Sequence, residues 1–140
     1  MARYKVNTTD FYAANNRRCK RGKRVGQIFY AISWGWGILL LSCLIVTGVN
    51  QESDAIVGFG YLAMGIVNLC FAAFHIYALI KGWHKDYLYY QNRGKYGHSF
   101  INEEAEKNSK DEYYFLMIFA GIILLVFTVW LFVTGIGRLA

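Results

Sequence analysis

Residues 55–80 read AIVGFGYLAMGIVNLCFAAFHIYALI, a stretch that contains no Asp, Glu, Lys or Arg. Two further uncharged apolar stretches, Val25 to Val49 and Tyr113 to Gly137, lie before and after it in the chain. About 20 helical residues are enough to cross the hydrocarbon core of a bilayer, and each stretch is longer than that. The sequence therefore predicts an all-α integral membrane protein with three transmembrane helices, spanning about residues 25–49, 55–80 and 113–137.

The composition of the whole chain leads to the same fold class. The 140 residues are 56% hydrophobic and 18% aromatic, and they include no proline. A single domain of this size cannot bury so much apolar surface in a water-soluble core, so lipid must cover the excess.

The segments between the apolar stretches define the domain organisation. Five polar residues, Asn50 to Asp54, separate the first two stretches, and so short a linker forces an antiparallel helical hairpin. We predict a basic N-terminal arm at residues 1–24 and a transmembrane domain at residues 25–140, with a polar loop at residues 81–112. Residues 102–112 are charged and rich in helix formers, which predicts that the third helix extends into water.

The distribution of basic residues predicts the orientation. Of the 15 Lys and Arg residues, eight precede the first span, six lie in the polar loop, and only Arg138 follows the third span. Cytoplasmic segments carry an excess of Lys and Arg. We therefore expect the N-terminus and the loop on the cytoplasmic side of a bacterial cytoplasmic membrane, or the matrix side of a mitochondrial inner membrane, with the C-terminus opposite.

One face of the second span is small and polar. Its residues recur at spacings of three and four, which places them on one side of a helix. In lipid, helices associate through close backbone approach at small residues and through interhelical hydrogen bonds. This face predicts a helix-packing seam against another helix of the chain or against another subunit, whereas Leu62 is expected off the seam. The seam consists of Gly58, Tyr61, Gly65, Asn68, Ala72 and His75.

Depth along the hairpin predicts particular contacts of this seam. Counting a rise of about 1.5 Å per residue from the turn places Asn68 level with Gly35, Trp36 and Gly37. We expect close approach at the two glycines and a hydrogen bond from the Trp36 indole to Asn68. The third span carries a weaker packing pattern of residues seven apart, Gly121, Thr128 and Gly135.

A basic cluster lies directly before the first span. Such a cluster attracts anionic lipid headgroups at about 1 kcal/mol per residue, and it can also bind an acidic partner subunit. The interleaved aromatic residues of a base-stacking site are lacking, so no nucleic acid is expected as a partner. The cluster comprises Arg17, Arg18, Lys20, Arg21, Lys23 and Arg24.

Signals of enzymatic chemistry and of cofactor binding are weak. His75 could in principle ligate haem or relay protons, but the spans offer neither a second haem ligand nor an acidic residue. Cys19, Cys43 and Cys70 form neither a CxxC pair nor a zinc spacing with the histidines. Nucleotide-binding, hydrolase and zinc-protease motifs are also missing. We therefore expect no catalytic, metal or cofactor-binding residues and no enzyme activity.

Three functions fit these observations. The first is an accessory, structural or assembly subunit of a larger membrane complex, with other membrane protein subunits and anionic lipids as partners. The second is a homo-oligomeric pore or membrane-perturbing effector, which needs a polar helix face turned toward a shared axis. The third is an electron-transfer or transport subunit that uses His75.

Overall fold

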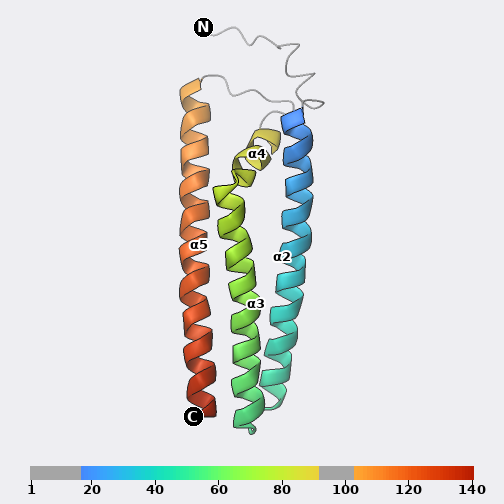
Figure 1. The fold of residues 1–140 in the computed structure, drawn as a ribbon, viewed down its shortest axis with the longest axis vertical. Helices are drawn as coiled ribbons and strands as arrows, with labels where there is room; N and C mark the ends of the chain where they lie inside the picture. The colour runs from blue at the N-terminus through green and yellow to red at the C-terminus, as the bar shows by residue number, and fades with distance from the viewer. Residues whose placement is uncertain (1–16, 92–102) are drawn as a thin grey trace. The chain divides into compact units, whose positions relative to one another are not determined.

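The computed structural model describes residues 17–91 and 103–140, and the side chains of residues 17–91 and 110–140. Within these residues the structure contains four helices and no strand: α2 (Arg17–Val49), α3 (Asp54–Ile80), α4 (Trp83–Tyr89) and α5 (Glu103–Leu139) (Figure 1). Three of them, α2, α3 and α5, are long and apolar enough to cross a membrane. The prediction of an all-α fold with three such helices is confirmed.

Two of the long helices extend beyond the apolar stretches. α2 begins at Arg17, so the described basic cluster forms its first two turns. α5 begins at Glu103, and the predicted helical extension of the third span is therefore present. Lys, Arg and Glu are good helix formers, which explains why the helices continue where hydrophobicity ends.

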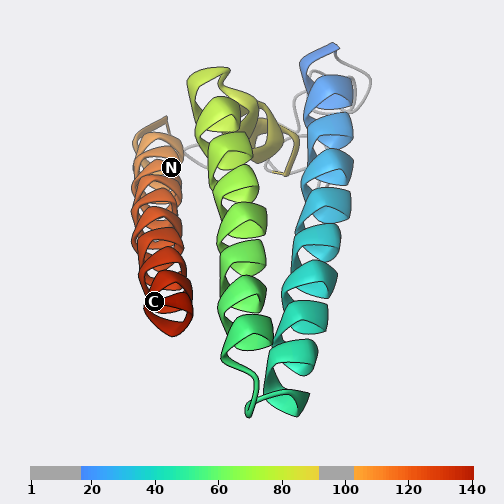
Figure 2. The ribbon, with the colours of Figure 1, turned by 60° about the horizontal axis from the view of Figure 1, so that its bottom comes forward.

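Figure 2 shows the turn that joins α2 to α3. Polar residues of the turn itself hold it. The side-chain amide of Asn50 donates to the carbonyl of Val46 at 2.8 Å, which satisfies one of the last carbonyls of α2. At the start of α3, the Ser53 hydroxyl accepts from the backbone N–H of Ile56 at 3.4 Å. Ser53 thus occupies the N-cap position of α3.

The predicted polar loop contains a short helix that the sequence pattern did not indicate. α3 ends in a turn at Gly82, whose φ of 73° lies in the left-handed region that glycine adopts without steric cost. α4 follows directly, and His84, Asp86 and Leu88 on it are buried. A seven-residue helix is too short to be stable by propensity alone, so its tertiary contacts must hold it.

The chain divides into two compact units, and the divisions fall inside α2, α3 and α5. Unit 1 comprises Met1–Phe29 and Ala78–Ile118, and unit 2 comprises Tyr30–Tyr77 and Phe119–Ala140. The described interior of unit 1 includes Cys19, Val25 and Leu88. The interior of unit 2 includes Val57, Met64, Asn68, Ala72, Thr128 and Leu131.

Candidate functional site

In unit 2, the predicted seam of α3 lies against α5. A Cβ on Gly58 would lie 3.1 Å from the carbonyl oxygen of Gly135, and a Cβ on Gly135 would lie 3.0 Å from the carbonyl oxygen of Gly58. The two backbones therefore touch. Further along, a Cβ on Gly65 would lie 3.0 to 3.2 Å from the ring of Phe132. Glycine at these positions permits an approach that any larger side chain would oppose.

The other seam residues lie in the same region. The ring of Tyr61 meets that of Trp130 edge-on, with centroids 6.0 Å apart. His75 is 8% exposed, and a Cβ on Gly121 would lie 3.3 Å from its Cδ2. Ala72, between these contacts, is fully buried.

The weaker pattern on the third span supplies the partners of the seam. Gly121 meets His75, Thr128 meets Asn68, and Gly135 meets Gly58. These α5 residues are seven apart, the repeat of left-handed helix pairs. Because the α5 numbers fall as the α3 numbers rise, the two helices run antiparallel. An ion pair between Arg138 and Asp54, 2.7 Å apart, joins the end of α5 to the start of α3.

The expectation that Leu62 lies off the seam is wrong. A Cβ on Gly135 would lie 3.1 Å from both Cγ and Cδ2 of Leu62. The reason is geometric: α5 lacks a side chain at residue 135, so a long neighbouring side chain of α3 folds over that glycine. The contact face is thus wider than the small and polar residues alone indicated.

Asn68 forms a polar junction that links the three long helices in unit 2. Its side chain is fully buried, and its Oδ1 accepts the indole N–H of Trp36 in α2 at 3.1 Å. Its Nδ2 donates to the hydroxyl of Thr128 at 2.8 Å and to the carbonyl of Leu124 at 2.9 Å, both in α5. The predicted Trp36–Asn68 hydrogen bond is confirmed. An uncharged amide in such hydrogen bonds can fix the positions of helices, but it does not release a proton and so cannot act in a proton relay.

The expected close approach at Gly35 and Gly37 is not present. A Cβ at either position would meet no atom within 4 Å. At this level the ring of Trp36 stacks on Phe71, with centroids 4.6 Å apart, and two stacked rings hold the backbones of α2 and α3 apart. α2 and α3 come close instead nearer the turn, where a Cβ on Gly60 would collide with the methyl group of Thr47.

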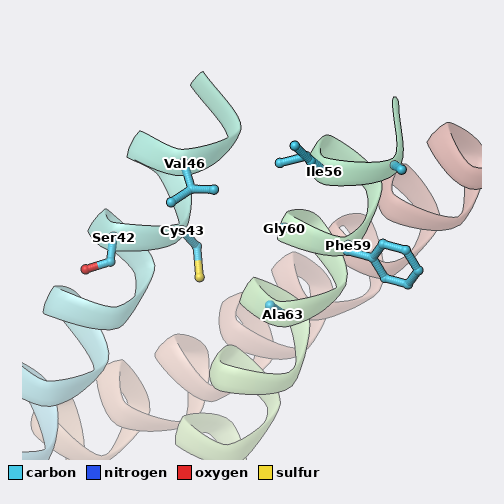
Figure 3. Close-up of a pocket in the computed structure, with 8 residues that line it drawn as sticks. Ser42, Cys43, Val46, Ile56, Phe59, Gly60 and Ala63 are labelled. Carbon is cyan, nitrogen blue, oxygen red and sulfur yellow. The ribbon is translucent and has the colours of Figure 1, made fainter. Parts of the chain in front are cut away.

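A groove runs between α2 and α3 in unit 2, on the side of α3 away from the seam. Near the turn it forms a hollow of about 490 Å³, across which Val46 and Ile56 point toward each other (Figure 3). This hollow is lined by Ser42, Cys43, Val46, Ala55, Ile56, Phe59, Gly60 and Ala63. A second hollow of about 390 Å³ is lined by Ile32, Gly35, Trp36, Leu39, Ile66, Val67, Cys70 and Phe71.

The two hollows are parts of one surface, which we call the α2–α3 groove. Residues that line one hollow have counterparts seven positions away in the chain that line the other. Gly35 corresponds in this way to Ser42, and Ala63 corresponds to Cys70. Seven residues are close to two turns of a helix, so both sets lie on the same faces of α2 and α3. The lining is almost entirely apolar.

In unit 1, two residues of the basic cluster bind a buried carboxylate of α4. Asp86 is 6% exposed, and its oxygens lie 3.3 Å from Nε of Arg18 and 2.9 Å from Nε of Arg21. The guanidinium of Arg18 also lies 4.4 Å from the ring centroid of Tyr89. The other four residues of the cluster, Arg17, Lys20, Lys23 and Arg24, are exposed.

The close contact of α4 with α2 depends on a glycine pair that the sequence analysis missed. A Cβ on Gly22 would collide with the backbone oxygen of Asp86 and lie 2.7 Å from Cβ of Tyr90. A Cβ on Gly26 would lie 2.6 Å from the Tyr87 ring. Gly22 and Gly26 form a GxxxG spacing, a known signal of close helix packing. Gly22 lies in the charged flank and Gly26 lies just inside the first apolar stretch, so the pair crosses the boundary between the two segments.

The part of the chain that the structure describes contains no group of three or more His, Cys, Asp or Glu residues that could hold a metal ion. The fold and its surfaces define a class: an all-α chain with three candidate membrane spans, a glycine-rich helix seam and a basic flank. Comparison with protein-family models, with curated proteins and with solved structures finds no match.

Proposed function

We propose that this chain is a non-enzymatic accessory subunit of a larger membrane protein complex and that it binds a transmembrane helix of a partner subunit in the α2–α3 groove. The observation that carries this proposal is the continuity of the groove along two helices. From Ile32 to Val46 it extends about 21 Å at 1.5 Å per residue. The hydrocarbon core is about 30 Å thick, so the groove offers contact over most of a crossing helix.

The burial of the spans supports the same function. Within the most apolar 18 residues of α2 none is buried, whereas 33% of the corresponding stretch of α3 is buried. α2 therefore has most of its apolar surface left for lipid or for a partner. Small residues at Gly35, Gly60 and Ala63 form the floor of the groove, and helices in membranes associate where small residues allow close approach.

Charge supports an orientation for the subunit. In this proposal, the exposed residues of the basic cluster face the cytoplasm or the mitochondrial matrix, where they contact anionic lipids. The membrane is then the bacterial cytoplasmic membrane or the mitochondrial inner membrane.

The alternative functions have less support. A homo-oligomeric pore needs a polar face turned toward a shared axis, but Asn68 of the small and polar face is hydrogen-bonded to α5. An electron-transfer role needs room for a cofactor beside His75, whereas this side chain packs against Gly121. Both observations favour the accessory subunit.

Two glycines on α2 provide a matched test of the groove. Gly35 lines it and Gly37 does not, while a Cβ at either position meets no atom of the chain within 4 Å. The first atom of a new side chain therefore meets no steric conflict at either position. We expect Gly35→Phe to block the groove and Gly37→Phe to leave it open.

The measurement is the native mass of the protein extracted from its own membrane in mild detergent. Wild type and Gly37→Phe are expected to migrate in a complex much larger than the 16.1 kDa chain, and Gly35→Phe as a smaller species. A lone 16.1 kDa species for the wild type would refute the accessory role. A complex containing only copies of this chain would indicate the homo-oligomer. If both variants migrate like wild type, lipid acyl chains and not a partner helix fill the groove, and the proposed binding site is wrong.

A further inference from the structure

Unit 1 contains a hollow of its own, between α2, α4 and the beginning of the apolar part of α5. Its volume is about 510 Å³, which is within the range of sites that bind small molecules. One end is basic and the other end is apolar. Its lining includes Arg18, Lys85, Leu88, Lys110, Phe115 and Ile118.

Three basic side chains from three different helices meet in this hollow. Arg18 comes from α2, Lys85 from α4 and Lys110 from α5, and Asp111 is the one carboxylate among the lining residues. Arg18 is paired with Asp86, so Lys85, Lys110 and Asp111 leave the rest of the lining with a net formal charge of +1. The excess of positive charge favours an anionic ligand.

Ring contacts hold two of these cations in place. Nζ of Lys85 lies 4.9 Å from the ring centroid of Tyr114, which also lines the hollow, and Arg18 lies over Tyr89. The Tyr114 hydroxyl donates to the carbonyl of Leu79 at 3.2 Å, so the ring beneath Lys85 is itself anchored. The basic end of the hollow is thus built from oriented side chains.

The apolar end follows α5 into the candidate membrane span, which covers Lys110–Leu139. Lys110, Tyr114 and Ile118 are four apart and lie along one side of α5. At 1.5 Å per residue, the distance from Lys110 to Ile118 along the axis is about 12 Å. Phe115 and Ile118 are exposed, so an apolar chain can lie against them.

We infer that this hollow binds an anionic phospholipid, with the phosphate of the headgroup beside Lys85 and Lys110 and the upper part of an acyl chain against Phe115 and Ile118. Basic pockets at the ends of transmembrane helices are suited to such headgroups. A free phosphate ion would satisfy the basic end alone, whereas a phospholipid matches both ends. The inference rests on unit 1 and is independent of the helix proposed for the α2–α3 groove.

The experiment measures binding of phosphatidylglycerol and of phosphatidylcholine to the full chain by native mass spectrometry. The test variant is Lys85→Gln with Lys110→Gln, which removes both charges from the hollow. The matched control is Lys20→Gln with Lys23→Gln, which removes two charges from exposed positions of α2 outside it. A second variant, Lys85→Arg with Lys110→Arg, keeps both charges and reports on whether the hollow itself tolerates substitution.

We expect wild type to prefer phosphatidylglycerol and the Gln pair in the hollow to weaken its binding about tenfold or more, because two charge-assisted hydrogen bonds to the phosphate are lost. The Arg pair should bind like wild type, and the Lys20 and Lys23 pair should lose much less. Equal losses for the two Gln pairs would overturn the inference, because the attraction would then be general. Equal binding of both lipids, or displacement of phosphatidylglycerol by inorganic phosphate at millimolar concentration, would overturn it as well.

Discussion

At the scale of single residues, α3 uses two different means to contact its neighbours. Asn68 contributes hydrogen bonds to both α2 and α5. Gly58 and Gly65 contribute the absence of a side chain, which lets α5 come close. In lipid an individual interhelical hydrogen bond is worth only about 1 to 2 kcal/mol at most, whereas a bulky side chain at a close contact moves a whole helix.

This difference predicts a ranking of three substitutions in unit 2. Gly65→Leu should destabilise the protein most, because its side chain would overlap the ring of Phe132. Asn68→Leu should cost about 2 kcal/mol, since it removes three hydrogen bonds that average about 0.6 kcal/mol each inside membranes. Gly48→Leu should be nearly neutral, because a Cβ at residue 48 meets no atom within 4 Å. Thermal unfolding of the three purified variants in one detergent measures the ranking.

The control, Gly48→Leu, replaces a glycine within a helix, as Gly65→Leu does. Both variants therefore gain the same helix propensity. If Gly65→Leu unfolds at the temperature of Gly48→Leu, the contact between α3 and α5 at Phe132 is looser than the distances indicate. Should Asn68→Leu prove the most damaging of the three, hydrogen bonding and not close approach is the main source of helix association.

At the scale of elements, α4 is the helix that depends most on its neighbours. Seven residues cannot sustain a helix in water by themselves. α4 is held because the glycine pair of α2 lets its backbone approach and because Asp86 binds Arg18 and Arg21. His84 of α4 adds a stacked contact with Phe29 of α2, their ring centroids 4.7 Å apart.

We therefore predict that Gly22→Ala releases α4. The added methyl group would collide with the backbone oxygen of Asp86, which cannot move aside as a flexible side chain would. Overpacking of this kind costs typically 1 to 3 kcal/mol, so amide hydrogen exchange from Asp86 to Tyr90 should accelerate about tenfold or more. Lys23→Ala, at the exposed neighbouring position, should leave that exchange unchanged. Protection in Gly22→Ala equal to that in wild type would mean that Gly22 does not determine the contact.

The elements that the sequence could predict are those governed by composition and by local geometry. Long uncharged stretches indicated α2, α3 and α5, and a constant rise per residue from the turn was sufficient to pair Trp36 with Asn68. The sequence pattern did not predict α4, because the stability of this helix comes from partners distant in the chain, such as Arg18 and Arg21 for Asp86.

Contacts that depend on side-chain bulk were also beyond the sequence pattern. Gly35 and Gly37 are small and lie at the right depth, but the stacked rings of Trp36 and Phe71 keep the helices apart there. Leu62 is large and apolar, but it packs over a glycine of α5. The α2–α3 groove and the basic hollow arise from surfaces of several helices, and no single stretch of sequence contains them.

At the scale of the whole molecule, the proposals share one requirement, which is that each surface lies at the correct depth in a membrane. The α2–α3 groove needs lipid or a partner helix beside it over most of its length. The basic hollow needs a headgroup layer beside Lys85 and Lys110, with hydrocarbon beside Ile118. Both requirements follow from one orientation of the chain, so a measurement of orientation tests them together.

We predict that positions 52 and 140 are reached from one side of the membrane and positions 20 and 81 from the other. The reason is the charge distribution: fourteen of the 15 Lys and Arg residues lie before the first span or between the second and third, and this bias sets topology. The measurement uses single cysteines, Glu52→Cys, Ala140→Cys, Lys20→Cys and Lys81→Cys, in a chain whose native cysteines are replaced, with a thiol reagent that cannot cross sealed membranes. Before lysis the reagent should reach only one pair, and after lysis it should reach all four. If positions 52 and 81 react from the same side, α3 does not cross the membrane, and neither the groove nor the hollow can lie at the depth that its ligand requires.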